Sequence, residues 1–308
     1  MFSHEYIYHL IFIFTMAALN TDGTPIQTGA SFLPDISPFK ILSINCQGLG
    51  CPKRRALFFS LLSINYAFDM IFLQETHAPF GNKWSQEWLN VSGGKSHFPH
   101  AKSNNSAGVA ILFHKSFIFQ EHSYIADPNG HFISMSISQN DFHYQLINVY
   151  GPGQQKEAFY ESLEDYILST GPLLISGDFN FTENGMDREG PGKFSNRNQK
   201  GSLAFSKIKS RFNLKDIWRS LNPKKQQFTY FGPEKQKGQV KSRIDRTYIS
   251  NHFDTKTSQA DILPFGLSDH YMISATIQLK HFKVSDRGPG YPKMNIQVLD
   301  YEPFKNDL

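Results

Sequence analysis

Residues 172–180 read Pro-Leu-Leu-Ile-Ser-Gly-Asp-Phe-Asn, an apolar run that passes directly into an acid and an amide. A short apolar run that stops at glycine predicts a buried strand over Pro172–Ser176. Asp178 and Asn180 are two residues apart, so on an extended segment they point the same way, while Phe179 points into the core. The acid could take a proton from water, and the amide could stabilise a charged transition state. An Asx-turn that only closes the strand is the alternative for this stretch alone.

Polar side chains follow other predicted strands in the same way. Asn45, Glu75 and Tyr150 each stand where an apolar run ends, and functional groups gather at such positions in α/β proteins. Glu75 directly follows Met-Ile-Phe-Leu-Gln, where a charge is costly to bury without a cation or a donor. Taken singly, Glu75 is also explained as the exit of a strand into solvent, and Tyr150 as core packing.

Two motifs in the last third complete the set. In Ser242-Arg-Ile-Asp245 the strand alternation predicts Ile244 inward and Asp245 outward. In Ser268-Asp-His270 a histidine stands beside an acid, and such a histidine donates to phosphate when a carboxylate holds its tautomer. The remaining histidines show no HxH or HExxH spacing, so no zinc site is predicted.

The order of predicted elements indicates the fold class. Too many strands lack a following helix for a doubly wound parallel sheet, so we predict an α/β fold in which two mixed sheets pack together with helices outside. We expect a flexible extension over 1–38, one domain over 39–280 and a linker-like tail over 281–308. The predicted helices cover 52–64, 153–168 and 202–212, and the predicted strands cover 39–45, 69–74, 108–113, 131–137, 144–150, 172–176, 227–231, 243–249 and 271–278.

The N-terminus and the cysteines bear on the compartment. Ile7–Leu19 is apolar but shorter than the roughly 20 residues that span a bilayer, and it lacks a basic leader. A signal peptide or anchor is therefore the less favoured interpretation, and Met16 is a possible internal start. Only Cys46 and Cys51 are present, which excludes a disulfide framework and favours a reducing, intracellular compartment.

Charge is distributed unevenly along the chain. Residues 191–246 hold 15 Lys+Arg and 3 Asp+Glu, whereas the rest of the chain holds 16 and 24. A basic stretch in an otherwise acidic chain indicates a polyanionic partner, with a solvated lysine-rich surface as the alternative.

In this order the motifs resemble the endonuclease/exonuclease/phosphatase superfamily, which includes apurinic endonucleases and exonuclease III. The resemblance covers residues 39–280 and implies a four-layer α/β/β/α sandwich. Within the superfamily the chain looks most similar to the endonuclease of LINE-type (non-LTR) retrotransposons, and its tail (Arg287-Gly-Pro-Gly-Tyr291) resembles their linker to reverse transcriptase. This similarity rests on Gln74-Glu-Thr-His77, Gly130-His-Phe-Ile133, Asn148-Val-Tyr-Gly-Pro152, Gly177-Asp-Phe-Asn180 with Asp187-Arg188, Phe228-Thr-Tyr230, Ser242-Arg-Ile-Asp245 and Ser268-Asp-His270.

The resemblance also implies a metal site. Glu75 would bind Mg²⁺, with Asn45 and Asp269 beside it, and Mn²⁺ as a substitute. Apurinic endonucleases carry an aspartate two residues after the asparagine, where this chain has Gln47. A neutral amide is a weaker ligand for Mg²⁺ than a carboxylate, so a single metal ion is expected.

The catalytic roles implied by the resemblance fall on five residues. Asp178 would orient or deprotonate the attacking water, and Asn180 and Tyr150 would stabilise the transition state. His270 would contact the scissile phosphate and would be oriented by Asp245. Supporting polar contacts would come from Thr229, Ser242 and Ser268.

The expected function is a Mg²⁺-dependent DNA endonuclease, derived from a retrotransposon, that nicks a strand and leaves a 3′-hydroxyl. We expect a nuclear monomer without stable membrane association. Three alternatives remain open: a repair nuclease (an apurinic-site endonuclease or 3′-exonuclease), a phosphatase of inositol phosphates or lipid head groups, and a DNA-binding remnant without turnover. Specificity is expected in the loop over 222–240.

Overall fold

The computed structural model describes residues 38–280 apart from short gaps at 66–67, 102–105, 140–141, 169–170, 192–195, 237 and 257. The described residues belong to one compact unit. Residues 1–37, with their apolar stretch Ile7–Leu19, and the expected tail over 281–308 lie outside the described residues. Among the helices of the described part, none has the length and apolar character needed to cross a membrane.

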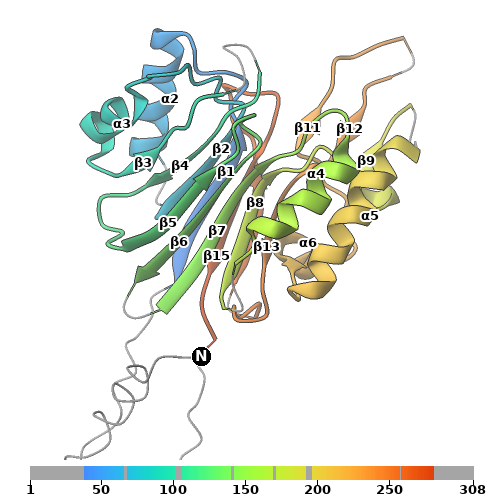
Figure 1. Ribbon diagram of the computed structural model, residues 1–308. Helices are drawn as coiled ribbons and strands as arrows, with labels where there is room; N and C mark the ends of the chain where they lie inside the picture. The colour runs from blue at the N-terminus through green and yellow to red at the C-terminus, as the bar shows by residue number, and fades with distance from the viewer. Residues whose placement is uncertain are drawn as a thin grey trace, which may run out of the picture. The chain divides into compact units, whose positions relative to one another are not determined.

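Two six-stranded mixed sheets form the centre of the structure (Figure 1). The first has the order β14 (Gln259–Leu263), β15 (Met272–Ile277), β1 (Phe39–Asn45), β2 (Met70–Gln74), β4 (Val109–Phe113) and β3 (Ser96–His97). The second has the order β10 (Lys215–Asp216), β13 (Asp245–Ile249), β8 (Leu173–Asp178), β7 (Phe142–Tyr150), β6 (Phe132–Gln139) and β5 (Gln120–Ala126). A small third sheet joins β11 (Tyr230–Phe231), β12 (Lys241–Ser242) and β9 (Arg188–Glu189).

Helices cover the outer face of each large sheet (Figure 1). The side chains of α2 (Pro52–Asn65) and α3 (Trp84–Ser92) pack on Leu42, Ile44 and Leu73 of the first sheet. Those of α4 (Lys156–Leu163) and α5 (Asn196–Arg211) pack on Ile147, Ile175 and Tyr248 of the second sheet. The short helices η1 (Glu164–Tyr166), η2 (Gly185–Asp187) and α6 (Ile217–Leu221) lie between strands in the chain. The predicted α/β/β/α sandwich of two mixed sheets is confirmed.

Several element boundaries differ from the prediction. The helix expected over 153–168 is α4 followed by the 3₁₀ turn η1, and the helix expected over 202–212 begins six residues earlier, at Asn196. The strand expected over 227–231 shrinks to β11. The sequence reading missed β5 because this strand, Gln-Glu-His-Ser-Tyr-Ile-Ala, lies at the sheet edge and is largely exposed, so it has no apolar alternation. It also missed α3, although Trp84 and Trp88 stand four residues apart on its buried face.

A polar bridge joins the two sheets across their common face. Asn148 of β7 donates to the carbonyl oxygens of Leu73 and Ala110 in the first sheet, at 2.8 Å each. The Gln74 amide donates to Asn148 Oδ1 at 2.8 Å and to Ser43 Oγ at 3.2 Å. All these side chains are buried, so the bonds fix how one sheet sits on the other.

Strand register brings the predicted strand-end residues to one edge. β1 and β2 are parallel and pair Asn45 with Gln74, the residue before Glu75. β7 and β8 are also parallel and pair Tyr150 with Asp178. β13 runs antiparallel to β8, so its first residue, Asp245, lies opposite Asp178. The carboxyl ends of four parallel-paired strands and the start of β13 therefore meet at the same edge of the sandwich.

Asn148→Ala tests the bridge between the sheets. The variant removes the Asn148 donor from two buried carbonyls, and a buried group left without its partner costs about 1–3 kcal/mol. The Gln74 amide loses one of its three acceptors and keeps Ser43 and Phe72. We expect the free energy of unfolding in urea to fall by about 3 kcal/mol, against about 0.5 kcal/mol or less for the exposed control Asn90→Ala. Equal stability of the two variants would contradict the bridge.

Candidate active site

Two carboxylates and an imidazole form the buried centre of the site. Asp178, Asp245 and His270 are 1%, 0% and 5% exposed, and one ligand atom of each lies within 4.8 Å of the others. His270 Nδ1 donates to Asp245 Oδ2 at 2.9 Å, which fixes the ring and leaves Nε2 directed away from Asp245. The predicted pairing of Asp245 with His270 is present in the structure.

Asp178 combines the two roles that the sequence left open. Its Oδ1 accepts the backbone N–H of Asn180 at 2.9 Å, which is an Asx-turn, and Asn180 takes the left-handed conformation with φ 53°. Its Oδ2 accepts the amide of Asn45 at 3.0 Å, at the edge of the sandwich where the strand-end residues meet. Burial and the nearby charge of Asp245 raise the pKa of Asp178, which makes it a better proton acceptor than an ordinary carboxylate.

His270 is held in its charged form. Burial would lower the pKa of His270, but the charge of Asp245 and its hydrogen bond outweigh burial and raise the pKa to about 10. At neutral pH the ring is therefore an imidazolium with a proton on each nitrogen. Its Nε2 lies 3.9 Å from Asp269 Oδ1, so this second donor is directed to the more open part of the site.

Glu75, Tyr150 and Asn180 form the wall beside Asp178. The Tyr150 hydroxyl lies close enough to the Glu75 carboxylate and to the Asn180 side chain for both to influence its pKa. Burial, followed by the charge of Glu75, raises the pKa of Tyr150 far above its ordinary value, so the hydroxyl keeps its proton. His131, which the sequence reading did not assign a role, stacks on the Tyr150 ring with 5.7 Å between centroids and donates from Nδ1 to the Tyr150 carbonyl at 2.9 Å.

Glu75 and Asp269 are the partly exposed carboxylates that a hard cation would use. Their side chains are 26% and 38% exposed, and Asp269 Oδ1 is buried without a hydrogen-bond partner among the described residues. Burial raises the pKa of Asp269; the His270 charge opposes this, and the Glu75 charge adds to it. Two neighbouring carboxylates with an unpaired oxygen are a donor set suited to an oxygen-preferring divalent ion.

The buried group of Asp178, Asp245 and His270 fits a metal less well. His270 is protonated, and a protonated ring has no lone pair for a metal. Asn45 directs its amide nitrogen to Glu75 Oε1 and Asp178 Oδ2, at 3.0 Å each, while its oxygen accepts the N–H of Gln47. In this orientation Asn45 links the two carboxylates, and ligation of a metal by Asn45 stays a prediction.

The three predicted supporting residues stabilise the loops of the site. Thr229 Oγ1 accepts the backbone N–H groups of Ile244 and Asp245 at 3.1 and 3.2 Å. Ser268 Oγ donates to the Asn45 carbonyl at 2.7 Å and accepts the N–H of His270 at 3.0 Å. Ser242 is buried, and its hydroxyl accepts from Arg188 Nη1 at 3.3 Å.

The predicted orientations around Ile244 are wrong. Ile244 is partly exposed, whereas Asp245 is fully buried. The reason is local: Asp245 faces the other sheet and His270, and buried arginines occupy the positions on both sides of this stretch, at 243 and 246.

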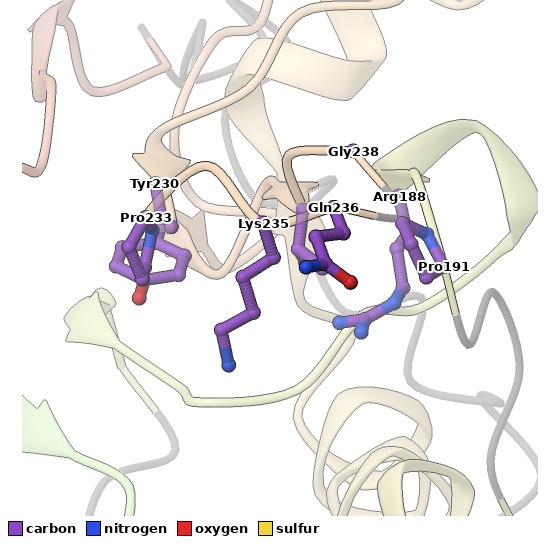
Figure 2. Close-up of a pocket in the computed structure, with 9 residues that line it drawn as sticks. Arg188, Pro191, Tyr230, Pro233, Lys235, Gln236 and Gly238 are labelled. Carbon is purple, nitrogen blue, oxygen red and sulfur yellow. The ribbon is translucent and has the colours of Figure 1, made fainter.

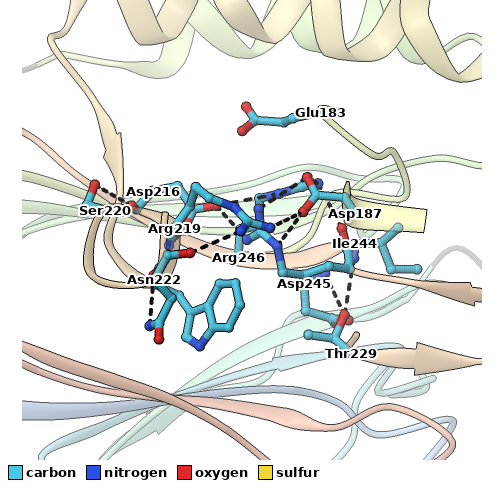
Figure 3. A network of polar contacts seen from close by, with 12 residues as sticks. Glu183, Asp187, Asp216, Arg219, Ser220, Asn222, Thr229, Ile244, Asp245 and Arg246 are labelled. Atoms are coloured by element: carbon cyan, nitrogen blue, oxygen red, sulfur yellow. Dashed lines mark hydrogen bonds and ion pairs between the residues drawn. The ribbon is translucent and has the colours of Figure 1, made fainter. Parts of the chain in front are cut away.

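A buried ion-pair network lies under Asp245, and sequence reasoning missed it (Figure 3). Asp187, which is 0% exposed, accepts from Arg219 at 2.8 Å, from Arg243 at 2.7 Å and from Arg246 at 3.3 Å. Arg243 also donates to Asp216 at 2.5 Å. No spacing of these residues identifies the pairing, because the partners come from η2, β10, α6, β13 and the link between β12 and β13.

This network changes the interpretation of the basic stretch over 191–246. Arg243 and Arg246 are 0% and 1% exposed and Arg219 is largely buried, so their charges are neutralised inside the protein. The positive charge that faces solvent is therefore smaller than the residue count suggested. Side chains such as Lys200, Lys207 and Arg211 remain about two-thirds exposed.

A cavity of about 700 Å³ lies beside His270 (Figure 2). Tyr230 forms one wall, and its ring lies 5.0 Å from that of His270 between centroids. Arg188, Lys235 and Gln236 add polar groups, and the Lys235 and Arg188 side chains extend to the same side in the close-up (Figure 2). The cavity falls in the loop over 222–240 where the sequence placed specificity, together with residues around β9.

The fold and the acid–histidine edge define a hydrolytic enzyme that acts on phosphodiester bonds. The Endonuclease/Exonuclease/phosphatase family matches residues 42–270, and the chain belongs to this family. It is 33% identical over 281 residues, 87% of the chain, to the transposon TX1 uncharacterized 149 kDa protein of Xenopus laevis, and it spans 20% of that relative's length.

Solved structures share the fold. An AP endonuclease from Archaeoglobus fulgidus superposes with a TM-score of 0.63 at 19% identity, over 78% of this chain and all of the other. A 3′ phosphatase from Neisseria, bound to product DNA hairpin, superposes with a TM-score of 0.61 at 20% identity, over 79% of this chain and 99% of the other.

Asp187→Asn tests the network under the site. Burial alone would raise the pKa of Asp187, but the charges of Arg246 and Arg243 and the hydrogen bonds of Arg243 and Arg219 hold it well below its usual range. Breaking such a buried pair costs about 3–5 kcal/mol, which we expect as lost unfolding free energy at pH 7.

The pH dependence of this loss has a definite sign. A carboxylate whose pKa is lower in the folded state than in the unfolded state adds to the free energy of unfolding at pH values above the unfolded aspartate pKa of about 3.9. This contribution is lost as the pH falls towards the folded-state pKa. The stability gap between wild type and Asp187→Asn is therefore expected to be constant from pH 7 to about pH 5 and to narrow below about pH 4. Urea unfolding across this range measures it; a gap that widens in acid would contradict the assignment.

Proposed function

We propose that this chain is a Mg²⁺-dependent endonuclease, derived from a retrotransposon, that nicks DNA and leaves a 3′-hydroxyl. The observation that carries the proposal is the juxtaposition of a raised-pKa carboxylate, Asp178, a charged His270 and a Glu75–Asp269 pair with an unpaired oxygen. Phosphodiester hydrolysis needs a proton acceptor for water, donors for the phosphate oxygens and a cation, and these groups provide them.

Each residue has a task that its environment supports. Asp178 accepts the proton of the attacking water, and Asn45 and the Asn180 N–H hold its carboxylate in place. His270 donates from Nε2 to a phosphate oxygen, because Asp245 occupies its other nitrogen. Tyr150 keeps its proton and donates to the charge that develops on the phosphate. Glu75 and Asp269 would hold Mg²⁺, with Mn²⁺ as a substitute, and the bound ion would supply neutralisation of the phosphate charge.

DNA is the proposed partner for two reasons beyond the catalytic groups. The cavity next to Tyr230 has the polar and ring-bearing lining that suits a nucleotide adjacent to the cleaved phosphate. The relative by sequence is a transposon protein, and one structural neighbour carries product DNA. With DNA as substrate, the proposed place of action is the nucleus and the proposed form is a monomer.

Nicking of supercoiled plasmid in MgCl₂ tests the function. Wild type should convert the plasmid to open circles, EDTA should stop it, and Asp178→Ala and His270→Ala should each lose about 10²–10⁴-fold in rate, the usual contribution of general acid–base groups. Asp261→Ala and His143→Ala, which change exposed residues of the same types, should retain activity. Nicking by wild type no faster than by Asp178→Ala would refute the proposal.

The nicked product and the choice of substrate test two further parts of the proposal. A polymerase should extend the nick directly if the product carries a 3′-hydroxyl, and the choice of substrate separates the proposal from a repair nuclease. Wild type should cut an intact A/T-rich duplex at least as fast as one with an abasic site. A strong preference for the abasic duplex would place the enzyme with the apurinic endonucleases, and retained DNA binding without cleavage would indicate a binding remnant.

Lys235→Ala tests the cavity as a DNA contact. A lysine that neutralises one phosphate contributes about 0.9 to the slope of log affinity against log salt on duplex DNA. We expect the variant to bind DNA more weakly and to reduce that slope by about one unit, measured by fluorescence anisotropy. Lys207→Ala, an exposed lysine paired with Glu161 at 3.0 Å, is the control and should keep the wild-type slope. An unchanged slope for Lys235→Ala would remove the cavity from the DNA-binding surface.

A further inference from the structure

Three loops that carry the proposed cation site are joined by hydrogen bonds. The loop after β1 pairs with the loop after β2, because the N–H groups of Gly48 and Leu49 donate to the carbonyls of Glu75 and Thr76 at 2.7 and 2.9 Å. The third loop, which carries Asp269, reaches the first through the Ser268 hydroxyl. The relative position of Glu75 and Asp269 therefore depends on how these loops are held together.

Arg54, near the start of α2, links two of these loops at once. Its guanidinium donates to the carbonyls of Gly48 and Cys46, the latter at 2.7 Å, in the loop that follows Asn45. It also donates to the carbonyl of Leu267 at 2.6 Å, two residues before Asp269. Leu267 lies 213 residues after Arg54 in the sequence, so this one side chain joins a loop that is close to it in the chain to a loop that is distant.

The loop that Arg54 holds has a strained backbone conformation. Gln47 and Gly48 both have positive φ, at 48° and 80°, and only glycine takes such values without strain. A Cβ at position 48 would lie 2.7 Å from His77 Nδ1, so this loop is also closely packed on the loop after β2. External hydrogen bonds are what keep a strained segment in one conformation.

We propose that Arg54 is a positioning residue that sets the distance from Glu75 and Asn45 to Asp269, and thereby the affinity for the divalent cation. The proposal rests on the cation site of the proposed function. A guanidinium is planar, with donors in a fixed fork, so it can serve three carbonyls at once, whereas an ammonium group cannot replace this geometry.

Replacement of Arg54 is expected to change the cation affinity in opposite directions, depending on whether its charge or its geometry matters. A positive charge near the site, taken alone, repels a cation, so removal of Arg54 would strengthen cation binding if only charge mattered. If positioning dominates, Arg54→Lys keeps the charge but weakens binding, and Arg54→Met weakens it as well. Loss of partners that orient metal ligands typically costs 10–100-fold in metal affinity, so we expect a loss of about tenfold in both variants.

The experiment measures Mn²⁺ binding to the full chain by the electron paramagnetic resonance signal of the free ion, without DNA. Lys53→Met, an exposed neighbour on the same helix turn, is the matched control and should bind as wild type does. The double variant Glu75→Gln/Asp269→Asn identifies the site by abolishing the tight binding. Thermal unfolding checks that each variant is folded. If Arg54→Met does not fold, the Mn²⁺ affinity of Arg54→Lys decides between positioning and charge.

Nicking activity supplies the second measurement. The Mg²⁺ concentration for half-maximal rate should rise about tenfold in Arg54→Lys, while the rate at saturating Mg²⁺ and the KM for DNA change little. Wild-type Mn²⁺ affinity in Arg54→Lys, tighter binding in Arg54→Met, or a change confined to the KM for DNA would each overturn the positioning role. Wild type that binds Mn²⁺ but does not nick would overturn the proposed function alone, and absence of Mn²⁺ binding would overturn both.

Discussion

The structure depends on the burial of two carboxylates, Asp178 and Asp245, side by side. Pairing of β8 with β13 places them opposite each other, and both are almost fully buried. Two like charges in a dry interior repel strongly, so the neighbouring groups compensate them. The His270 imidazolium pairs with Asp245, and the Asn45 amide donates to Asp178. The raised pKa of Asp178 and the raised pKa of His270 both follow from this one constraint.

The rest of the sandwich holds the two buried carboxylates and their partners in place. The bridge from Asn148 to the first sheet prevents the two sheets from sliding, and a slip would separate Asn45 from Asp178. Thr229 holds the backbone of Asp245 on one side, and the network around Asp187 holds its neighbours on the other. A site whose dipoles are fixed before the substrate arrives stabilises transition-state charge without reorganisation. Rigidity of the surrounding fold is therefore part of the chemistry.

Arginine has two distinct uses in this chain. Arg243 and Arg246 are buried structural cations, and their charge is balanced by Asp187 and Asp216. Arg54 also works inside the fold, but on backbone carbonyls of the loops around the proposed cation site. Positive charge available to a polyanion is left to lysines at the surface and to the groups that line the cavity beside Tyr230. A count of basic residues in the sequence does not separate these uses, because burial decides which charges solvent or DNA can reach.

The sequence by itself determined the class of fold, most strand positions and the identity of the polar residues at the strand ends. Apolar runs and their periodicity are local, so β1, β2, β4, β7 and β8 could be placed without any partner. The exposed edge strand β5 could not, because its residues bury little. Tertiary structure alone decided that Asp178 meets Asp245, that Asn45 turns its amide nitrogen to two carboxylates, and that Asp187 pairs with arginines from distant segments. Strand register and the packing of the sheets create these contacts, and neither leaves a signal in residue spacing along one chain.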